Sequence, residues 1–172
     1  MGAYTVPWCG RIYGALVGAH RDRSWSIRPA APADAGEIAE VVTAAGVAAW
    51  GAFLGSERVE AATSGVRHPA DLVAADADGV LAFVAWNAAT GEILRLYTHP
   101  RGWGRGAGSA LLDRALAALR GNGCQRAWLH TEGRNLRARR FYEHHGWRLD
   151  GTARDRVWHG ARLHEPRYVI DL

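Results

Sequence analysis

The stretch from Glu92 to Leu119 constrains the fold of this chain more than any other. Glu92 to Thr98 has the bulky, alternating residues that are typical of a β-strand, and Pro100 predicts an end near Thr98 because proline cannot donate to a central ladder. From Ser109 the apolar residues follow the period of a helix. The sequence therefore predicts a strand, a short turn and a helix in direct succession.

The turn between strand and helix is rich in glycine. It contains Gly102, Gly104, Gly106 and Gly108, and Arg105 lies among them. Glycine lets backbone N–H groups approach a ligand closely, and the first N–H groups of a helix have no internal partner. We therefore expect an anion site that suits a pyrophosphate, with Arg105 adding positive charge; a tight turn without a ligand is the alternative. A P-loop is excluded because the chain has no lysine.

Composition is that of one globular domain, with 172 residues, 48% hydrophobic residues and a formal net charge of +4. The arginines are spread along the chain, so nucleic-acid binding is only weakly indicated, and a polyanionic cofactor explains the charge equally well. Cys9 and Cys124 match no zinc or redox spacing, which predicts free thiols, no metal site and a cytoplasmic location. We expect no membrane-spanning segment.

The remaining pattern divides the chain into an N-terminal extension, 1–24, and a domain, 25–172. Further strands are expected at 26–28, 72–75, 80–86, 126–131, 148–151 and 165–172, with 157–158 pairing before the last. Further helices are expected from Pro32 through Leu54, at 56–62 and at 136–144. This order predicts an α/β fold with a mixed sheet and helices on its faces.

Two motifs resemble those of the GNAT superfamily of acetyl-CoA-dependent N-acetyltransferases. Residues 103–108, Trp-Gly-Arg-Gly-Ala-Gly, are similar to the cofactor turn Gln/Arg-x-x-Gly-x-Gly/Ala, with Trp103 where Gln or Arg is usual. Residues 135–147 are similar to Asn-x-x-Ala-x-x-Phe/Leu-Tyr-x-x-x-Gly-Phe. The resemblance covers roughly 27–172, and both motifs occur in the family's order.

The resemblance implies a central mixed, mostly antiparallel sheet of six to seven strands, a splayed parallel pair within it, and about four helices. Acetyl-CoA would lie in the gap between the splayed strands, 92–98 and 126–131. Its pantetheine arm would pair with the backbone, its pyrophosphate would bind the glycine turn, and an asparagine would reach it from the following helix. The implied cofactor-binding residues are Leu96, Tyr97, Thr98, Gly104, Arg105, Gly106, Ala107, Gly108, Ser109 and Asn135.

Tyr142 matches the family tyrosine that protonates the departing sulfur; a core aromatic is the alternative. A backbone N–H near Tyr97 or Thr98 would stabilise the oxyanion. Glu92 is our first candidate for the general base, because the period of two places it on the face of Thr98. A solvated residue at the strand entry is the alternative for Glu92. His130 is the second candidate, since histidine titrates near neutrality, although a satisfied rim histidine is common.

His99 and Glu132 are weaker candidate bases, and we expect His144 and His145 to lie at the surface without a metal. The acceptor site of the family lies between the first two helices and the late strands. This implies Trp50 and Phe53 as substrate-binding residues, with Trp158 opposite, or else ordinary core residues.

The expected function is acetyl transfer from acetyl-CoA to a primary amine of a small molecule or protein, in a ternary complex. A protein N-terminus, a lysine, an antibiotic and a polyamine all stay open as acceptors. The alternative is a non-catalytic acyl-CoA-binding sensor or partner module. A homodimer is expected from the resemblance alone.

Overall fold

The computed structural model describes residues 24–172, so the predicted extension lies almost wholly outside the described residues. The strands are β1 Ser26–Pro29, β2 Leu72–Asp76, β3 Gly79–Asn87, β4 Glu92–Thr98, β5 Arg126–His130, β6 Arg148–Trp158 and β7 Ala161–Asp171. The helices are α1 Ala35–Leu54, α2 Ser56–Thr63, α3 Ala107–Gly121 and α4 Leu136–His144, with short 3-10 turns at Pro32–Asp34 and Pro100–Gly102.

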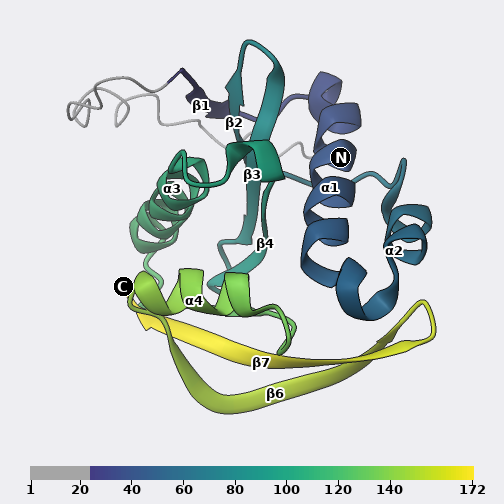
Figure 1. Cartoon of the computed structure of the whole chain (residues 1–172). Helices are drawn as coiled ribbons and strands as arrows, with labels where there is room; N and C mark the ends of the chain where they lie inside the picture. Colours follow the sequence, from purple (N-terminus) through teal and green to yellow (C-terminus); the bar gives the residue numbers. More distant parts are fainter. Residues whose placement is uncertain (1–23) are drawn as a thin grey trace, which may run out of the picture.

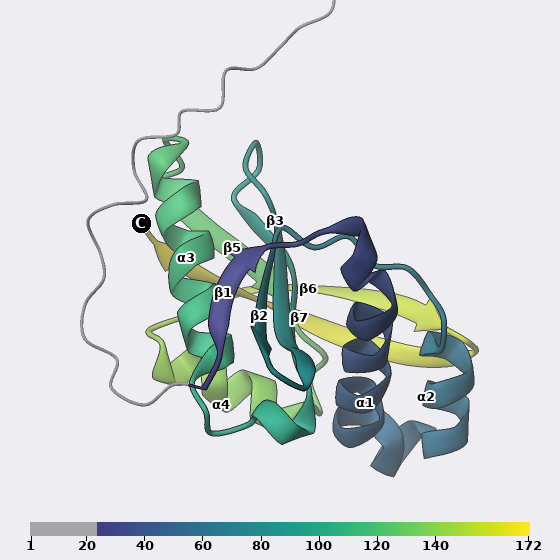
Figure 2. The same cartoon turned by 90° about the horizontal axis from the view of Figure 1, so that it is seen from above.

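One sheet of seven strands organises these elements, in the order β1-β2-β3-β4-β5-β7-β6. Only β4 and β5 run parallel; every other neighbouring pair is antiparallel. Helices α1 and α2 lie on one side of the sheet, and α3 and α4 lie on the other (Figures 1 and 2). The predicted mixed sheet with about four helices is confirmed, and so is the strand, turn and helix between Glu92 and Gly121.

The late strands are longer than predicted. Strands were expected only at 148–151 and 165–172, with 157–158 pairing before the last, yet β6 and β7 form one hairpin that closes at Trp158 and Ala161. The β6–β7 register shifts between Leu149 and Ala153, where Gly151 lies, and the pairing of the two strands continues on both sides of this shift. The hairpin forms the edge of the sheet after β5 and runs along the bottom of Figure 1, below α4 and α1.

Strands β4 and β5 separate almost as soon as they meet. Their ladder contains a single register pair, Glu92 with Trp128, and the Trp128 N–H donates to the Gly91 carbonyl at 3.0 Å. Beyond this point the two parallel strands diverge and leave a gap in the middle of the sheet. The predicted splayed pair is therefore present, with its closed end at Gly91 and Glu92.

A bulge in β4 changes which side chains share a face. Pairing with β3 shifts by one residue at Leu94, so Ile93 and Leu96 both pack into the core beneath α3. Glu92 therefore projects to the side of the sheet opposite Thr98. The expectation that Glu92 and Thr98 share a face was wrong, because an extra residue inverts the alternation on one side of a bulge.

The first helical segment is strongly apolar. Pro32–Leu54 is long and apolar enough to cross a membrane by length and composition alone, with a mean hydropathy of 1.4. Its residues Ile38, Val41 and Val42 are buried in a cluster with Val73 and Phe83 of the sheet. A core helix with such a buried face passes the same test, so the segment is weak evidence for a membrane.

The closed end of the splay generates a stability prediction. Gly91 has φ +74°, and a Cβ there would lie 2.5 Å from the Arg126 carbonyl oxygen. Gly91→Ala should therefore lower the free energy of unfolding by about 2 kcal/mol or more, measured by urea denaturation. Gly65→Ala is the matched control, because Gly65 also has positive φ, at +69°, but a Cβ there meets nothing within 4 Å. An equal loss in both variants would contradict the tight closure at Gly91.

Candidate active site

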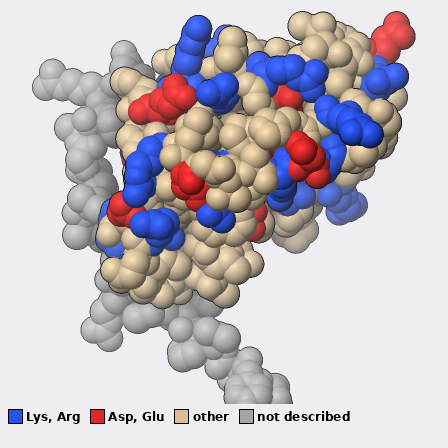
Figure 3. Space-filling view, turned by 90° about the horizontal axis from the view of Figure 1, so that it is seen from below, with Lys and Arg blue, Asp and Glu red and all other residues tan. Residues whose placement is uncertain are grey.

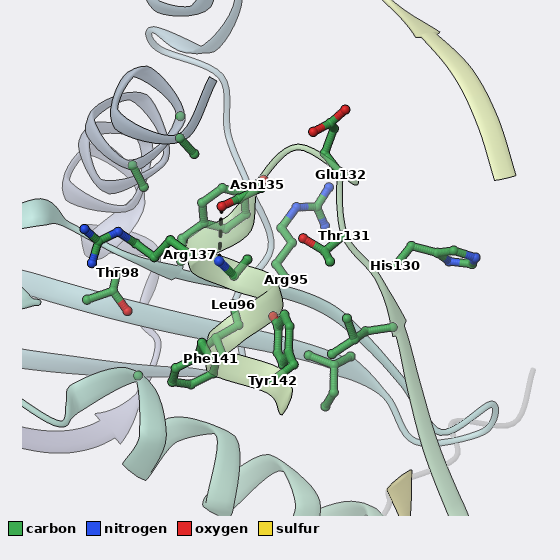
Figure 4. A pocket seen from close by; sticks show the side chains of 18 of the residues that line it. Arg95, Leu96, Thr98, His130, Thr131, Glu132, Asn135, Arg137, Phe141 and Tyr142 are labelled. Atoms are coloured by element: carbon green, nitrogen blue, oxygen red, sulfur yellow. Dashed lines mark hydrogen bonds between the residues drawn. The ribbon is translucent and has the colours of Figure 1, made fainter. Parts of the chain in front are cut away.

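The gap between β4 and β5 opens into a cavity of about 510 Å³. Walls come from β4, β5, the start of α3, α4, α1 and the β6–β7 hairpin, and Figure 4 shows the side chains that enter it. Predicted residues that line it are Trp50, Leu96, Tyr97, Thr98, Gly104, Gly106, Gly108, Ser109, His130, Asn135 and Tyr142. Predicted residues that do not line it are Phe53, Glu92, Arg105 and Ala107.

The backbone of β4 presents free polar groups to the gap. The His99 N–H donates to the Leu81 carbonyl of β3 at 2.8 Å. Because successive residues of an antiparallel strand point their polar groups to alternate sides, Tyr97 also bonds to β3, whereas Leu96 and Thr98 point toward β5. The N–H groups available in the gap are thus those of Leu96 and Thr98. The expectation of a donor at Tyr97 is not supported.

The glycine turn has the backbone shape that its sequence predicts. Gly104 and Gly106 adopt φ +74° and +77°, a left-handed conformation that costs glycine little, and α3 begins directly after Gly106. A Cβ on Gly108 would lie 2.9 Å from the Thr98 hydroxyl. Ala107 is fully buried and does not line the cavity. The N-terminal N–H groups of α3 are thereby left open to an anion.

Arg105 points away from the cavity, contrary to the expectation that it adds charge to the anion site. Its Nη1 donates to Asp76 at 2.8 Å, and Arg101 donates to the same carboxylate at 3.0 Å. Burial raises the pKa of Asp76, but the hydrogen bonds from the two arginines outweigh this and keep the pKa below its ordinary value. The two arginines therefore tie the turn to the end of β2.

A different arginine stands at this end of the cavity. The guanidinium carbon of Arg137 lies 3.6 Å from the centre of the Trp103 ring, and the Trp103 indole donates to the Thr98 carbonyl at 3.1 Å. Arg137 and Trp103 both line the cavity. The sequence motif did not single out Arg137, because the resemblance leaves that position unspecified.

Tyr142 is both a core residue and a cavity residue. It is 7% exposed, and its ring lies within 5.3 to 6.1 Å of the rings of Phe141, Trp147 and Tyr168. Its hydroxyl bonds to no residue between 24 and 172 and points into the gap beside Leu96 (Figure 4). Burial, and then Tyr97, raise the pKa of Tyr142 well above its ordinary value. The hydroxyl is therefore protonated at neutral pH and can donate.

Three predicted polar residues mainly hold loops in place. The Asn135 side chain accepts from the Ala138 N–H at 3.1 Å and caps α4. Glu132 is 3% exposed and accepts both the backbone N–H and the Nε–H of Arg134, at 2.6 and 2.8 Å. His99 accepts from the Arg101 N–H at 3.1 Å and does not line the cavity. These contacts leave the Asn135 amide NH₂ as the group that can reach a ligand.

The two main candidate bases differ in position. Glu92 lies half-buried at the closed end of the splay, and burial raises its pKa while Arg154 opposes the rise. His130 lines the cavity, and its Nδ1 is buried without a partner among the described residues. Burial, and then Arg154, lower the pKa of His130, so its ring is neutral at pH 7. Figure 4 shows His130 on the opposite side of β5 from Thr131.

The aromatic residues expected near the acceptor fall into two groups. Trp50 lines the cavity, and Trp158 packs against it edge to face with ring centres 5.5 Å apart but does not itself line the cavity. Phe53 lies outside the cavity lining, because the Arg134 guanidinium covers its ring at 4.0 Å. Phe53 therefore packs against the apolar cluster formed by Leu54, Val59 and Leu163 of the hairpin.

Charged residues that the sequence analysis missed line the part of the cavity formed by β4 and the β6–β7 hairpin, which is called the acceptor side below. Glu165 is 4% exposed and accepts from the Nε atoms of Arg154 and Arg156 at 2.7 and 2.8 Å. Arg95 projects from β4 to the same cavity. The alternate spacing of Arg154 and Arg156 is consistent with one face of a strand, but residues 152–156 were not predicted to be a strand, and only the register of the β6–β7 hairpin places both arginines beside Glu165.

The histidines near the other rim indicate no metal centre. His144 is exposed as expected, whereas His145 is half-buried with its Nδ1 at 2.7 Å from the Phe141 carbonyl. Within residues 24–172, no three His, Cys, Asp or Glu side chains gather closely enough to hold a metal ion.

Comparison with known proteins supports the motifs. The profile of the acetyltransferase (GNAT) family matches residues 48–147, more than half of the chain. Mycothiol acetyltransferase of Beutenbergia cavernae is 50% identical over 80 residues, which are 44% of this chain and 27% of that protein. The chain spans between about a quarter and a half of the curated relatives that it matches.

Solved structures share the fold at low sequence identity. A GCN5-related N-acetyltransferase of Rhodopseudomonas palustris superposes with a TM-score of 0.67 at 21% identity, covering 90% of this chain and 100% of that one. The PaiA N-acetyltransferase of Thermoplasma acidophilum, solved with coenzyme A, gives 0.66 at 19% identity, covering 84% and 98%. With the splayed strands, the glycine turn and the matched profile, the chain belongs to the acetyltransferase (GNAT) family of acyltransferases.

Proposed function

We propose that this protein transfers an acetyl group from acetyl-CoA to a primary amine by direct attack in a ternary complex. The observation that carries the proposal is the gap between β4 and β5, where a protonated tyrosine faces free backbone N–H groups. The family profile and the coenzyme A bound to PaiA support the choice of cofactor. A cytoplasmic location and a homodimer are further proposals, based on the sequence alone.

Acetyl-CoA supplies a thioester whose carbonyl carbon is open to an amine. The N–H groups of Leu96 and Thr98 suit the pantetheine arm and the carbonyl oxygen, because the splay leaves them without a strand partner. The first N–H groups of α3 suit the pyrophosphate, with Arg137 at the same end. The Asn135 amide NH₂ would meet the cofactor from the start of α4.

Proton transfer completes the reaction. The Tyr142 hydroxyl would donate its proton to the departing sulfur, which converts a poor leaving group into a thiol. Either His130 or, through water, Glu92 would take the proton that the amine loses. Trp50, with Trp158 packed against it, would form an apolar wall on the acceptor side.

The direct test of the proposed function is release of coenzyme A from acetyl-CoA in the presence of a panel of amines. Acetylation of at least one amine above the rate of thioester hydrolysis is expected. Binding of acetyl-CoA without any transfer would instead favour the non-catalytic acyl-CoA-binding module.

Gly106→Leu should abolish acetyl-CoA binding, because a side chain at this position obstructs the backbone cradle. Isothermal titration calorimetry measures the affinity directly. Gly65→Leu is the control for strain, since Gly65 also has positive φ, at +69°, but lies in a turn after α2 with nothing within 4 Å of its Cβ. Unchanged binding by the Gly106 variant would mean that the cofactor does not use this turn.

Tyr142→Phe should lower kcat about tenfold or more while the Kd for acetyl-CoA changes little, because only the proton donor is removed. Tyr97→Phe is the matched comparison, since Tyr97 is another tyrosine of the same cavity. A full rate in the Tyr142 variant, with a loss in the Tyr97 variant, would transfer the role to Tyr97.

The general base should produce an acid limb in the pH profile of kcat/KM. A base must be unprotonated to act, so activity should fall as pH drops through its pKa. The lowered pKa of His130 moves this limb to lower pH than an ordinary histidine would give, and the raised pKa of Glu92 moves it to higher pH than an ordinary glutamate would give. His130→Gln and Glu92→Gln are the test: the variant that removes the limb identifies the base, and an unchanged limb in both excludes both.

A further inference from the structure

The acceptor side of the cavity contains an arginine without a partner. Arg95 is half-buried on β4, and it forms no hydrogen bond, ion pair or ring contact with residues 24–172. Figure 4 shows its side chain rising from β4 toward the chain at Thr131 and Glu132. A guanidinium stays charged and is costly to bury alone, so a partly buried, unpaired one suits an anionic ligand.

Two further guanidiniums face the same space with unused donors. Arg154 and Arg156 each give only Nε to Glu165, and no described residue accepts from their terminal nitrogens. Burial raises the pKa of Tyr97, while Arg95 and Arg156 oppose the rise and Glu165 adds to it. Arg95, Arg154, Arg156 and Glu165 all line the same cavity as Tyr97.

The charges on this side do not balance. Three positive groups, Arg95, Arg154 and Arg156, line this part of the cavity together with one carboxylate, Glu165. Glu92, which lies outside the lining, is the other carboxylate that Arg154 acts on. Glu132 does not alter the balance because it is paired with Arg134 at 2.8 Å. An excess of positive charge repels an acceptor whose only charge is its ammonium group. A simple polyamine is therefore a poor fit.

We propose that the acceptor is an amine that also carries a carboxylate or phosphate group, which Arg95 and the free ends of Arg154 and Arg156 bind. The proposal rests on the proposed acetyl transfer and specifies its substrate class. On β4, Arg95 lies next to Leu96 and faces the opposite side of the strand. An anion at Arg95 would thus hold its amine beside the gap in which Leu96 and Thr98 present their N–H groups.

The test uses matched pairs of amines that differ only in the anion. Common amino acids are compared with their carboxamides, and phosphoethanolamine with ethanolamine, by release of coenzyme A. The anionic member should have a kcat/KM about tenfold or more above its neutral partner, because charge-assisted hydrogen bonds are lost with the anion. The pair that responds distinguishes a carboxylate from a phosphate. Equal rates within every pair would overturn the proposal.

Variants identify the residue responsible. Arg95→Gln should abolish the advantage of the anionic member over its neutral partner, and Arg95→Lys should restore part of that advantage. Arg114→Gln removes the same charge from an exposed position on α3 and should alter neither. An equal loss for both members in Arg95→Gln would indicate a structural role and contradict anion binding.

Calorimetric titration of the same acids and amides into the protein with coenzyme A separates this proposal from the proposed function. Binding of an acid that depends on Arg95, without release of coenzyme A, would retain the anion site and remove acetyl transfer. Failure of every acid to bind would overturn the anion site, whatever the catalytic result.

Discussion

Separation of two parallel strands is the constraint on which the rest of this structure depends. A strand inside a sheet normally has both rows of backbone groups paired, yet β4 is paired with β5 only at Glu92 and Trp128. The N–H groups of Leu96 and Thr98 are consequently left for another extended molecule. Gly91 closes the splay at one end, and the glycine turn before α3 opens it at the other. A cavity at this position follows from the backbone before any side chain is considered.

Two carboxylates, each held by two arginines, brace opposite sides of that cavity. Asp76 joins Arg101 to Arg105 behind the glycine turn, and Glu165 joins Arg154 to Arg156 on the acceptor side. The Asp76 ion pairs hold the glycine turn against the end of β2. The Glu165 ion pairs use only the Nε atoms of Arg154 and Arg156, so the terminal nitrogens of both arginines have no partner among the described residues. Figure 3 shows arginines and carboxylates interspersed over the face that it presents, without one continuous basic patch, which agrees with a charge distribution directed at a small ligand.

Local patterns were sufficient for the parts of the site made from consecutive residues. Strand β4 and helix α4 have the predicted bounds, because alternation in one and helical spacing in the other are strong, and the turn glycines take the left-handed conformation expected of them. The position of Tyr142 followed from its motif. The direction of a side chain could not be predicted in the same way. The sequence indicated that Arg105 would bind an anion, but Arg105 instead points away from the cavity and pairs with Asp76, which is distant in the chain.

The sequence by itself determined the family motifs, the order of strands and helices, and the glycine turn before α3, since each of these depends on residues close together in the chain. Only the tertiary structure decided the faces of β4, because a one-residue bulge opposite β3 inverts the alternation at Glu92. It also brought Arg95, Arg154, Arg156 and Glu165 together. Their meeting depends on the register of the β6–β7 hairpin and on the pairing of β7 with β5, which are long-range pairings that no local period encodes.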